Sequence, residues 1–191
     1  GISILNFRPS FSHDGKLLAT CGARDGKALT GDMLSRSEGN WMGRVWDLKN
    51  GKLLYNLEGH KGIVDEIQFS PDDQYIVTGS EDSTAKIWNA SSGRLTYNFN
   101  HHDGIVQKCY FTSDSRFLIS QSFNTGRIWD LETGKMVSEI KHDPGTTDGS
   151  GIYYISLSST GKYFKTVFYD FNSRKLFFFH YVFPYTIKFS P

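Results

Sequence analysis

The sequence predicts an all-β protein built from repeated four-stranded units, and three observations lead to this prediction. Trp46, Trp88 and Trp129 stand in the same local frame, GRVWDL, AKIWNA and GRIWDL, and are 42 and 41 residues apart. Short runs rich in β-forming residues alternate with turn sequences, and no stretch shows the apolar spacing of an amphipathic helix. A period of this length is typical of a unit that stacks on its neighbours to bury its faces.

The second unit shows the expected strands most clearly, at residues 63–69, 75–79, 84–88 and 94–99. Turn-forming sequences, SPDD, EDS and NASSG, separate these runs. In the first unit the same pattern places the second strand at 16–21 and the third at 43–46.

Apolar runs that follow a turn recur through the chain as FSHDGKLLAT, FSPDDQYIVT, FTSDSRFLIS and LSSTGKYFKT. A Gly-His or His-Asp step keeps the same period, with His60, His102 and His142 lying 42 and 40 residues apart. These matched positions divide the chain into approximate units at 1–57, 58–99, 100–140 and 141–184, with 185–191 opening a further one. From Leu176 to Phe189 the repeat is shortened, so the fourth strand of that unit is expected to be missing or fused.

Together these marks resemble the WD-repeat β-propeller family, whose unit of about 40–45 residues carries a Gly-His pair and a Trp-Asp pair. The resemblance implies blades of four antiparallel strands, of which this chain has four and the start of a fifth. Most members close at about seven blades. We therefore expect a single WD-repeat segment that is an incomplete portion of a larger propeller. Further blades or another chain are expected to complete its ring.

In this family a His, a Ser or Thr, an Asp and the Trp of a repeat form a hydrogen-bonded network, and the resemblance implies such a network here. The second unit carries the complete set, with His60, Asp82, Trp88 and Ser80 (or Thr78) as the hydroxyl. The other units carry parts of it: His102 and Trp129, with Asn124 for Asp, in the third; His142 and Asp170, with Leu176 for Trp, in the fourth; Trp46 in the first. Because the set recurs, it indicates structure and not a catalytic triad, so no catalytic residue is expected.

Two insertions interrupt the repeat, at 22–42 and at 143–151. In the first, 24 positions separate Gly22 from Trp46, where 8 separate Ser80 from Trp88. The second-to-third and fourth-to-first connections of a blade lie on one face of the disc, so both insertions fall on the same face. Loops of this kind carry binding function. The candidate partner-binding residues near this face are Arg24, Asp25, Lys61, Glu81, Asp103, Phe123 and Tyr169.

Composition narrows the class of function. Lys and Arg number 21 against 20 Asp and Glu, a net charge of +1 that gives no electrostatic footprint for nucleic acid. The most apolar stretch, 176–183, has eight residues, where a membrane-spanning helix needs about 20. The opening residues show no signal-peptide pattern. We expect a cytoplasmic or nuclear protein that neither binds nucleic acid directly nor inserts into a membrane.

The predicted function is a non-catalytic scaffold that binds a protein or peptide partner within a larger assembly through the insertion-bearing face. The alternative is a propeller-based enzyme or a module that binds a small ligand or a modification such as phosphate. Such a module requires a convergent polar or basic cluster, and the basic residues here are dispersed. No metal site and no cofactor are expected, because the histidines are explained by the repeat. Cys109 stands at a packing position, and the sequon at Asn89 lies in a turn.

Overall fold

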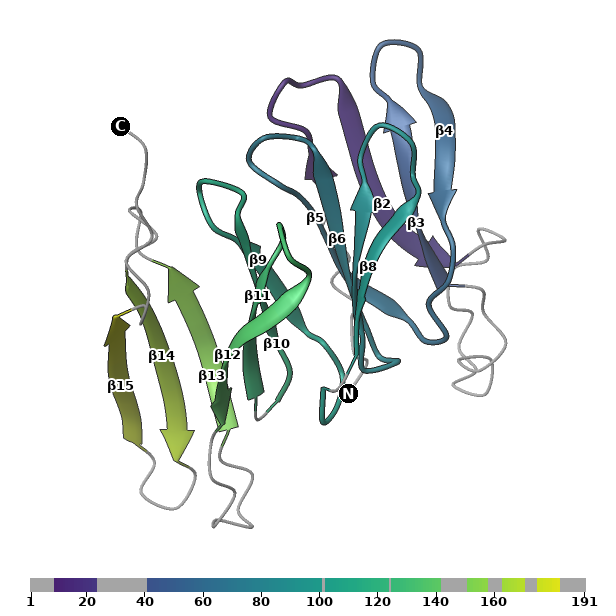
Figure 1. The fold of residues 1–191 in the computed structure, drawn as a ribbon. Helices are drawn as coiled ribbons and strands as arrows, with labels where there is room; N and C mark the ends of the chain where they lie inside the picture. The colour runs from purple at the N-terminus through teal and green to yellow at the C-terminus, as the bar shows by residue number, and fades with distance from the viewer. Residues whose placement is uncertain are drawn as a thin grey trace.

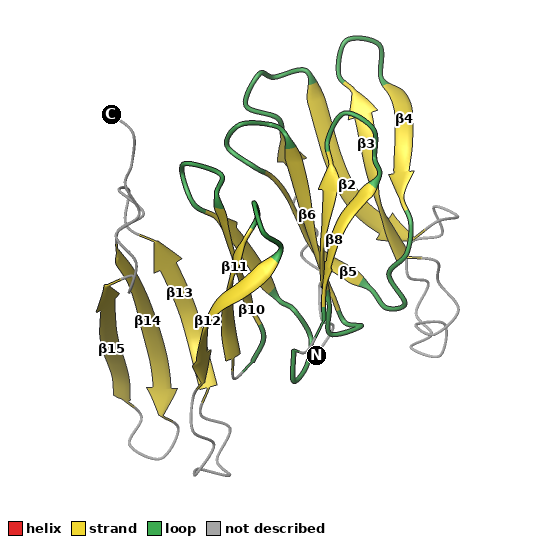
Figure 2. Cartoon of the chain, viewed as in Figure 1, coloured by secondary structure: helices red, strands yellow, loops and turns green. Residues whose placement is uncertain are grey.

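The computed structural model describes residues 9–23, 41–100, 102–123, 125–141, 151–157, 163–170 and 175–182. These residues form antiparallel sheets that follow one another in chain order and stack side by side (Figure 1). No helix occurs in the described ranges (Figure 2). The prediction of an all-β fold with four-stranded blades is therefore confirmed.

Each of the first three sheets is a simple meander in which neighbouring strands pair in chain order. The first sheet consists of β1 (Ser10–Phe11), β2 (Leu17–Ala23), β3 (Trp41–Asp47) and β4 (Lys52–Leu57). The second consists of β5 (Val64–Phe69), β6 (Tyr75–Ser80), β7 (Ala85–Asn89) and β8 (Leu95–Phe99). The third consists of β9 (Lys108–Phe111), β10 (Phe117–Gln121), β11 (Thr125–Asp130) and β12 (Lys135–Lys141).

The fourth sheet has three described strands, β13 (Gly151–Leu157), β14 (Tyr163–Asp170) and β15 (Lys175–Val182). Residues 183–191 lie outside the described part of the chain. The expected shortening of the repeat at 176–189 therefore stays a prediction, as does the start of a further unit at 185–191.

The turn between the first and second strands is built the same way in three sheets. A Ser or Thr hydroxyl donates to an Asp carboxylate two residues on and accepts the amide at the start of the next strand. The donor–acceptor pairs are Ser12–Asp14 at 2.7 Å, Ser70–Asp72 at 2.6 Å and Thr112–Asp114 at 2.5 Å. This local bonding explains why the sequence pattern Phe-Ser/Thr-x-Asp recurs where the chain reverses.

The apolar core lies between the sheets. One buried cluster joins the first and second sheets and includes Val45, Phe69 and Trp88. A second cluster joins the second and third sheets, where the rings of Phe99 and Trp129 stack with centroids 4.3 Å apart. Each four-stranded sheet thus buries a face against its neighbour, which one such sheet alone is unable to do.

A tyrosine on the fourth strand of one sheet also packs on the outer turn of the next. The Tyr55 hydroxyl donates to the carbonyl of Ala90. The Tyr55 ring lies so close to Gly93 that a Cβ there would overlap it, and Tyr97 approaches Gly134 in the same way. Gly93 and Gly134 also have positive φ, 68° and 69°, so both conformation and space require glycine.

We expect Gly93→Ala to lower the free energy of unfolding by about 2–4 kcal/mol, from the left-handed backbone and the overlap with Tyr55 together. Gly51→Ala is the matched control, because Gly51 has the same φ of 68° but open space around its Cβ position. The control should cost about 1 kcal/mol. Equal losses in denaturant titrations of the two variants would show that the Tyr55 contact contributes nothing.

Candidate functional site

The second sheet holds a continuous chain of hydrogen bonds across its buried side. The Trp88 indole Nε1 donates to Thr78 Oγ1 at 2.8 Å, and Thr78 Oγ1 lies 2.7 Å from His60 Nε2. His60 Nδ1 lies 2.9 Å from Asp82 Oδ2. Because the ionised Asp82 carboxylate can only accept, His60 Nδ1 carries the ring proton and donates it to Asp82. In the neutral imidazole Nε2 is then an acceptor, and it accepts the hydrogen of the Thr78 hydroxyl.

The Asp82 carboxylate also accepts hydrogen bonds from donors in two loops. The amide of Lys61 donates to Oδ2 at 2.9 Å, and the amide and hydroxyl of Thr84 donate to Oδ1 at 3.0 and 2.6 Å. The side chain of Asp82 is 9% exposed and that of His60 is fully buried. This carboxylate therefore fastens the loop after β6 to the loop before β5.

Thr78, and not Ser80, is the hydroxyl that links the histidine to the tryptophan. Both residues point to the same side of β6, because side chains alternate along a strand. Trp88 pairs with Ile76, so Thr78 is one side-chain step from it and Ser80 is two steps away at the end of the strand. The Ser80 hydroxyl accepts the amide of Asp82 at 3.1 Å and supports the turn.

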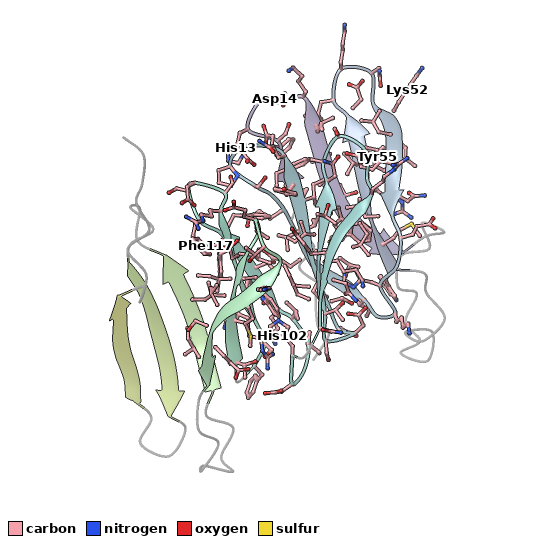
Figure 3. All side chains as sticks on the ribbon, viewed as in Figure 1. His13, Asp14, Lys52, Tyr55, His102 and Phe117 are labelled. Atoms are coloured by element: carbon pink, nitrogen blue, oxygen red, sulfur yellow. The ribbon has the colours of Figure 1, made fainter. Side chains whose placement is uncertain are left out.

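The third and first sheets contain shorter versions of this chain. In the third sheet, Trp129 Nε1 donates to Ser120 Oγ at 2.8 Å, and Ser120 Oγ lies 2.8 Å from His102 Nε2. Figure 3 labels His102 among the side chains of this sheet. In the first sheet, Trp46 Nε1 donates to Thr20 Oγ1 at 2.9 Å. Asn124 and His142 lie outside the described residues, and Asp170 and Leu176 are described only as strand positions.

These groups resemble a Ser-His-Asp set in composition, but their geometry is that of a core. The linking hydroxyls of Thr78 and Ser120 belong to residues with no exposed surface. A nucleophile has to reach a substrate in an open pocket. Within the described ranges, no three His, Cys, Asp or Glu side chains gather as a metal site would need. What this arrangement does is rigidify the blade, since satisfied buried polar networks specify one packing.

Burial sets the charge state of the network. Burial lowers the pKa of His60 below its ordinary value of 6.5, and the bond to Asp82 only partly opposes this. Burial alone would raise the pKa of Asp82, but the bonds from His60, Thr84 and the Lys61 amide outweigh it and hold that pKa below its ordinary 3.8. The native pair is thus a neutral imidazole beside an ionised carboxylate.

We expect the stability to fall in two stages as the pH is lowered. Below about pH 6.5 the unfolded state binds the His60 proton more readily than the native state does. Below about pH 3.8 the stabilisation from ionised Asp82 begins to disappear. In denaturant titrations between pH 7 and 5, His60→Gln should show a flatter pH dependence than the unsubstituted protein. Identical slopes would contradict this charge assignment.

The described candidates for partner binding lie at one end of the second and third sheets. Lys61 is exposed, and its amide bond to Asp82 brings it beside Glu81. In the third sheet Asp103 has a side-chain exposure of 60% and Phe123 a relative exposure of 51%. Arg24, Asp25 and most of both insertions lie outside the described residues, and Tyr169 is described only as part of β14.

A row of basic residues on the third strands was missed by the sequence reasoning. Lys86 and Arg127 each stand two residues before the tryptophan and are 6% and 4% exposed. Lys86 Nζ donates to Asn98 Oδ1 at 2.6 Å, and Arg127 pairs with Glu139 at 2.6 Å and with Asp103 at 3.6 Å. Their constant position, two residues before the tryptophan, is the sequence signal that could have identified them. Arg127 therefore ties the exposed Asp103 to the interior of its blade.

Comparison with known proteins finds one family match and several similar proteins. Residues 51–89 match the family described as "WD domain, G-beta repeat". Jouberin of Rattus norvegicus is 32% identical over 77 residues, covering 40% of this chain and 6% of that protein. Eukaryotic translation initiation factor 3 subunit I of Culex quinquefasciatus is 35% identical over 65 residues, covering 34% and 18%. Guanine nucleotide-binding protein subunit beta of Saccharomyces cerevisiae is 49% identical over 42 residues, covering 22% and 10%.

The matched segments thus span at most about a fifth of these relatives' own length. No helix capable of crossing a bilayer occurs in the described part of the chain.

Proposed function

We propose that this chain is a member of the WD-repeat family and that it acts as a non-catalytic scaffold for a protein or peptide partner in a larger assembly. The binding surface in this proposal is the end of the sheets that carries Lys61, Glu81, Asp103 and Phe123. The insertions at 22–42 and 143–151 add to this surface. We further propose residence in the cytoplasm or nucleus.

The observation that supports the proposal most is the division between buried and exposed polar groups. The triad-like groups of the second sheet are buried and bonded to one another. At the same end of the sheets, the side chains of Lys61 in the second sheet and of Asp103 and Phe123 in the third are exposed. A rigid blade that presents charged and aromatic side chains on fixed loops suits recognition of a partner more than chemistry. No described cluster favours the alternatives of an enzyme or a small-ligand module.

The test is affinity capture of the native partner by the unsubstituted protein and by a Lys61→Glu, Phe123→Ser variant. We expect the double substitution to reduce the captured partner at least tenfold, as measured by quantitative mass spectrometry. Gln74→Glu on the opposite face is the control, because Gln74 is exposed there. Asp73 is unsuitable as a control, since its carboxylate accepts the amides of His13 and Asp14 at 2.8 and 2.9 Å. Loss of capture only with Gln74→Glu would refute the proposed surface.

A further inference from the structure

The hairpins between the third and fourth strands repeat a second exposed pattern, at the other end of the sheets. Each hairpin closes with a glycine of positive φ, a basic residue and a large apolar residue. The three sets are Gly51-Lys52-Leu53, Gly93-Arg94-Leu95 and Gly134-Lys135-Met136. The apolar members pair across the hairpin with Trp46, Trp88 and Trp129 in turn, so they occupy equivalent places in the three blades.

These apolar side chains stay exposed although they border the packed core. Leu53, Leu95 and Met136 are 44%, 48% and 47% exposed. Isolated exposed leucines are ordinary on protein surfaces. Here the equivalent position is exposed in each of three consecutive blades, so these three residues are not isolated cases.

The hairpins also lie next to one another. Tyr55, two residues after Leu53, packs on Gly93, which directly precedes Arg94. Tyr97, two residues after Leu95, approaches Gly134 with its ring 2.5 Å from the place of a Cβ. Figure 3 shows Lys52 beside the tip of the first hairpin, with Tyr55 further along its strand toward the second sheet. The three basic-apolar pairs therefore form one strip along the outer rim of the sheets.

The strip has a marked charge. Its exposed cations are Lys49, Lys52, Arg94 and Lys135, and its exposed carboxylate is Glu132. None of the four cations makes an ion pair with another described residue. These four exposed cations against one exposed carboxylate leave the exposed side chains of the hairpins themselves positively charged.

We propose that this hairpin rim, Lys52, Leu53, Arg94, Leu95, Lys135 and Met136, is a second docking surface, for an acidic segment of a partner protein that carries several large apolar side chains. The three cations of the rim, with Lys49 beside them, select carboxylates, and the three apolar side chains contact the apolar residues spaced between these carboxylates. Each blade presents one half-covered apolar side chain between cations. This spacing suits contact with separate side chains of a peptide more than insertion into a lipid surface.

The probe is a synthetic peptide with Leu at positions i, i+3, i+4 and i+7 and Glu elsewhere, compared with a scrambled peptide of the same composition. Fluorescence anisotropy measures the Kd of each peptide for the whole protein. The Lys52→Glu, Arg94→Glu, Lys135→Glu variant tests the charges, and Leu95→Gln with Met136→Gln tests the apolar contacts. All five side chains are exposed, so native folding is expected and is checked by thermal melts. Lys61→Glu is the control on the opposite face.

We expect the ordered peptide to bind at least tenfold more tightly than the scrambled one. Each rim variant should weaken its binding at least tenfold, and Lys61→Glu should leave it unchanged. Raising the salt concentration should weaken binding to the native rim but not the residual binding of the charge-reversed variant. Equal affinity for the two peptides would overturn the proposal. So would undiminished binding by the rim variants, or association with anionic phosphatidylserine vesicles in the absence of measurable peptide binding.

Discussion

Trp88→Ala is expected to lower the free energy of unfolding by about 3–5 kcal/mol, the range for truncating a large buried aromatic side chain. Trp88 is 2% exposed, fills the core between the first two sheets and donates to Thr78. Its removal leaves both a cavity and an unpaired polar chain ending at His60. Trp46→Ala is the matched comparison, and it should cost less, because Trp46 is only half-buried and its hydroxyl partner has no histidine beyond it.

Denaturant titrations of Trp88→Ala and Trp46→Ala measure the two losses in the free energy of unfolding. Trp88→Phe separates the two contributions, because it keeps most of the ring volume and removes the Nε1 donor. We expect it to cost about 1–3 kcal/mol, the penalty for a buried hydroxyl left without its donor. Equal losses for Trp88→Ala and Trp46→Ala would mean that aromatic burial alone matters and that the network adds nothing.

Asp82→Ala is expected to cost about 2–4 kcal/mol. The substitution leaves the buried His60 Nδ1 proton and the amides of Lys61 and Thr84 without their acceptor. Leaving buried donors without an acceptor is much more costly than removing an exposed partner. Asp103→Ala is the control, because the Asp103 side chain is 60% exposed and its oxygen is 3.6 Å from Arg127. The control should change stability by less than about 1 kcal/mol.

A double-mutant cycle extends this prediction along the chain of bonds. If His60 and Thr78 transmit the effect, Asp82→Ala and Trp88→Phe should together cost less than the sum of their separate losses. Strict additivity would show that the two ends of the chain act independently, although the hydrogen bonds connect them in the structure.

The repeat was enough to predict the fold class, because its marks are chemical requirements of each blade. The tryptophan frame, the Ser/Thr-x-Asp turns and the glycines after the third strand all recur at fixed offsets. The ends of the strands were predicted less accurately than the fold class. The third strand of the first sheet was expected at 43–46 and runs over Trp41–Asp47, because Trp41 and Met42 continue the pairing with β2.

The network showed where sequence reasoning loses detail. Thr78 and Ser80 are both hydroxyls on the same side of β6, so composition and alternation do not separate them. The pairing of Ile76 with Trp88 does. The hairpin rim was not predicted either, because Gly-Lys-Leu and Gly-Arg-Leu look like ordinary turn sequences until the pairing places each apolar residue opposite a tryptophan.

Hydrogen–deuterium exchange of the protein, with and without its captured native partner, tests the central claim most directly. The account predicts slower exchange on binding in the loops at 58–63, 80–84 and 102–107, which carry Lys61, Glu81 and Asp103. The turns at 12–16, 70–74 and 112–116 should exchange at unchanged rates. Protection confined to those turns, with none in the three loops, would contradict the claim that this protein holds its partner at the end of the sheets that carries Lys61, Glu81 and Asp103.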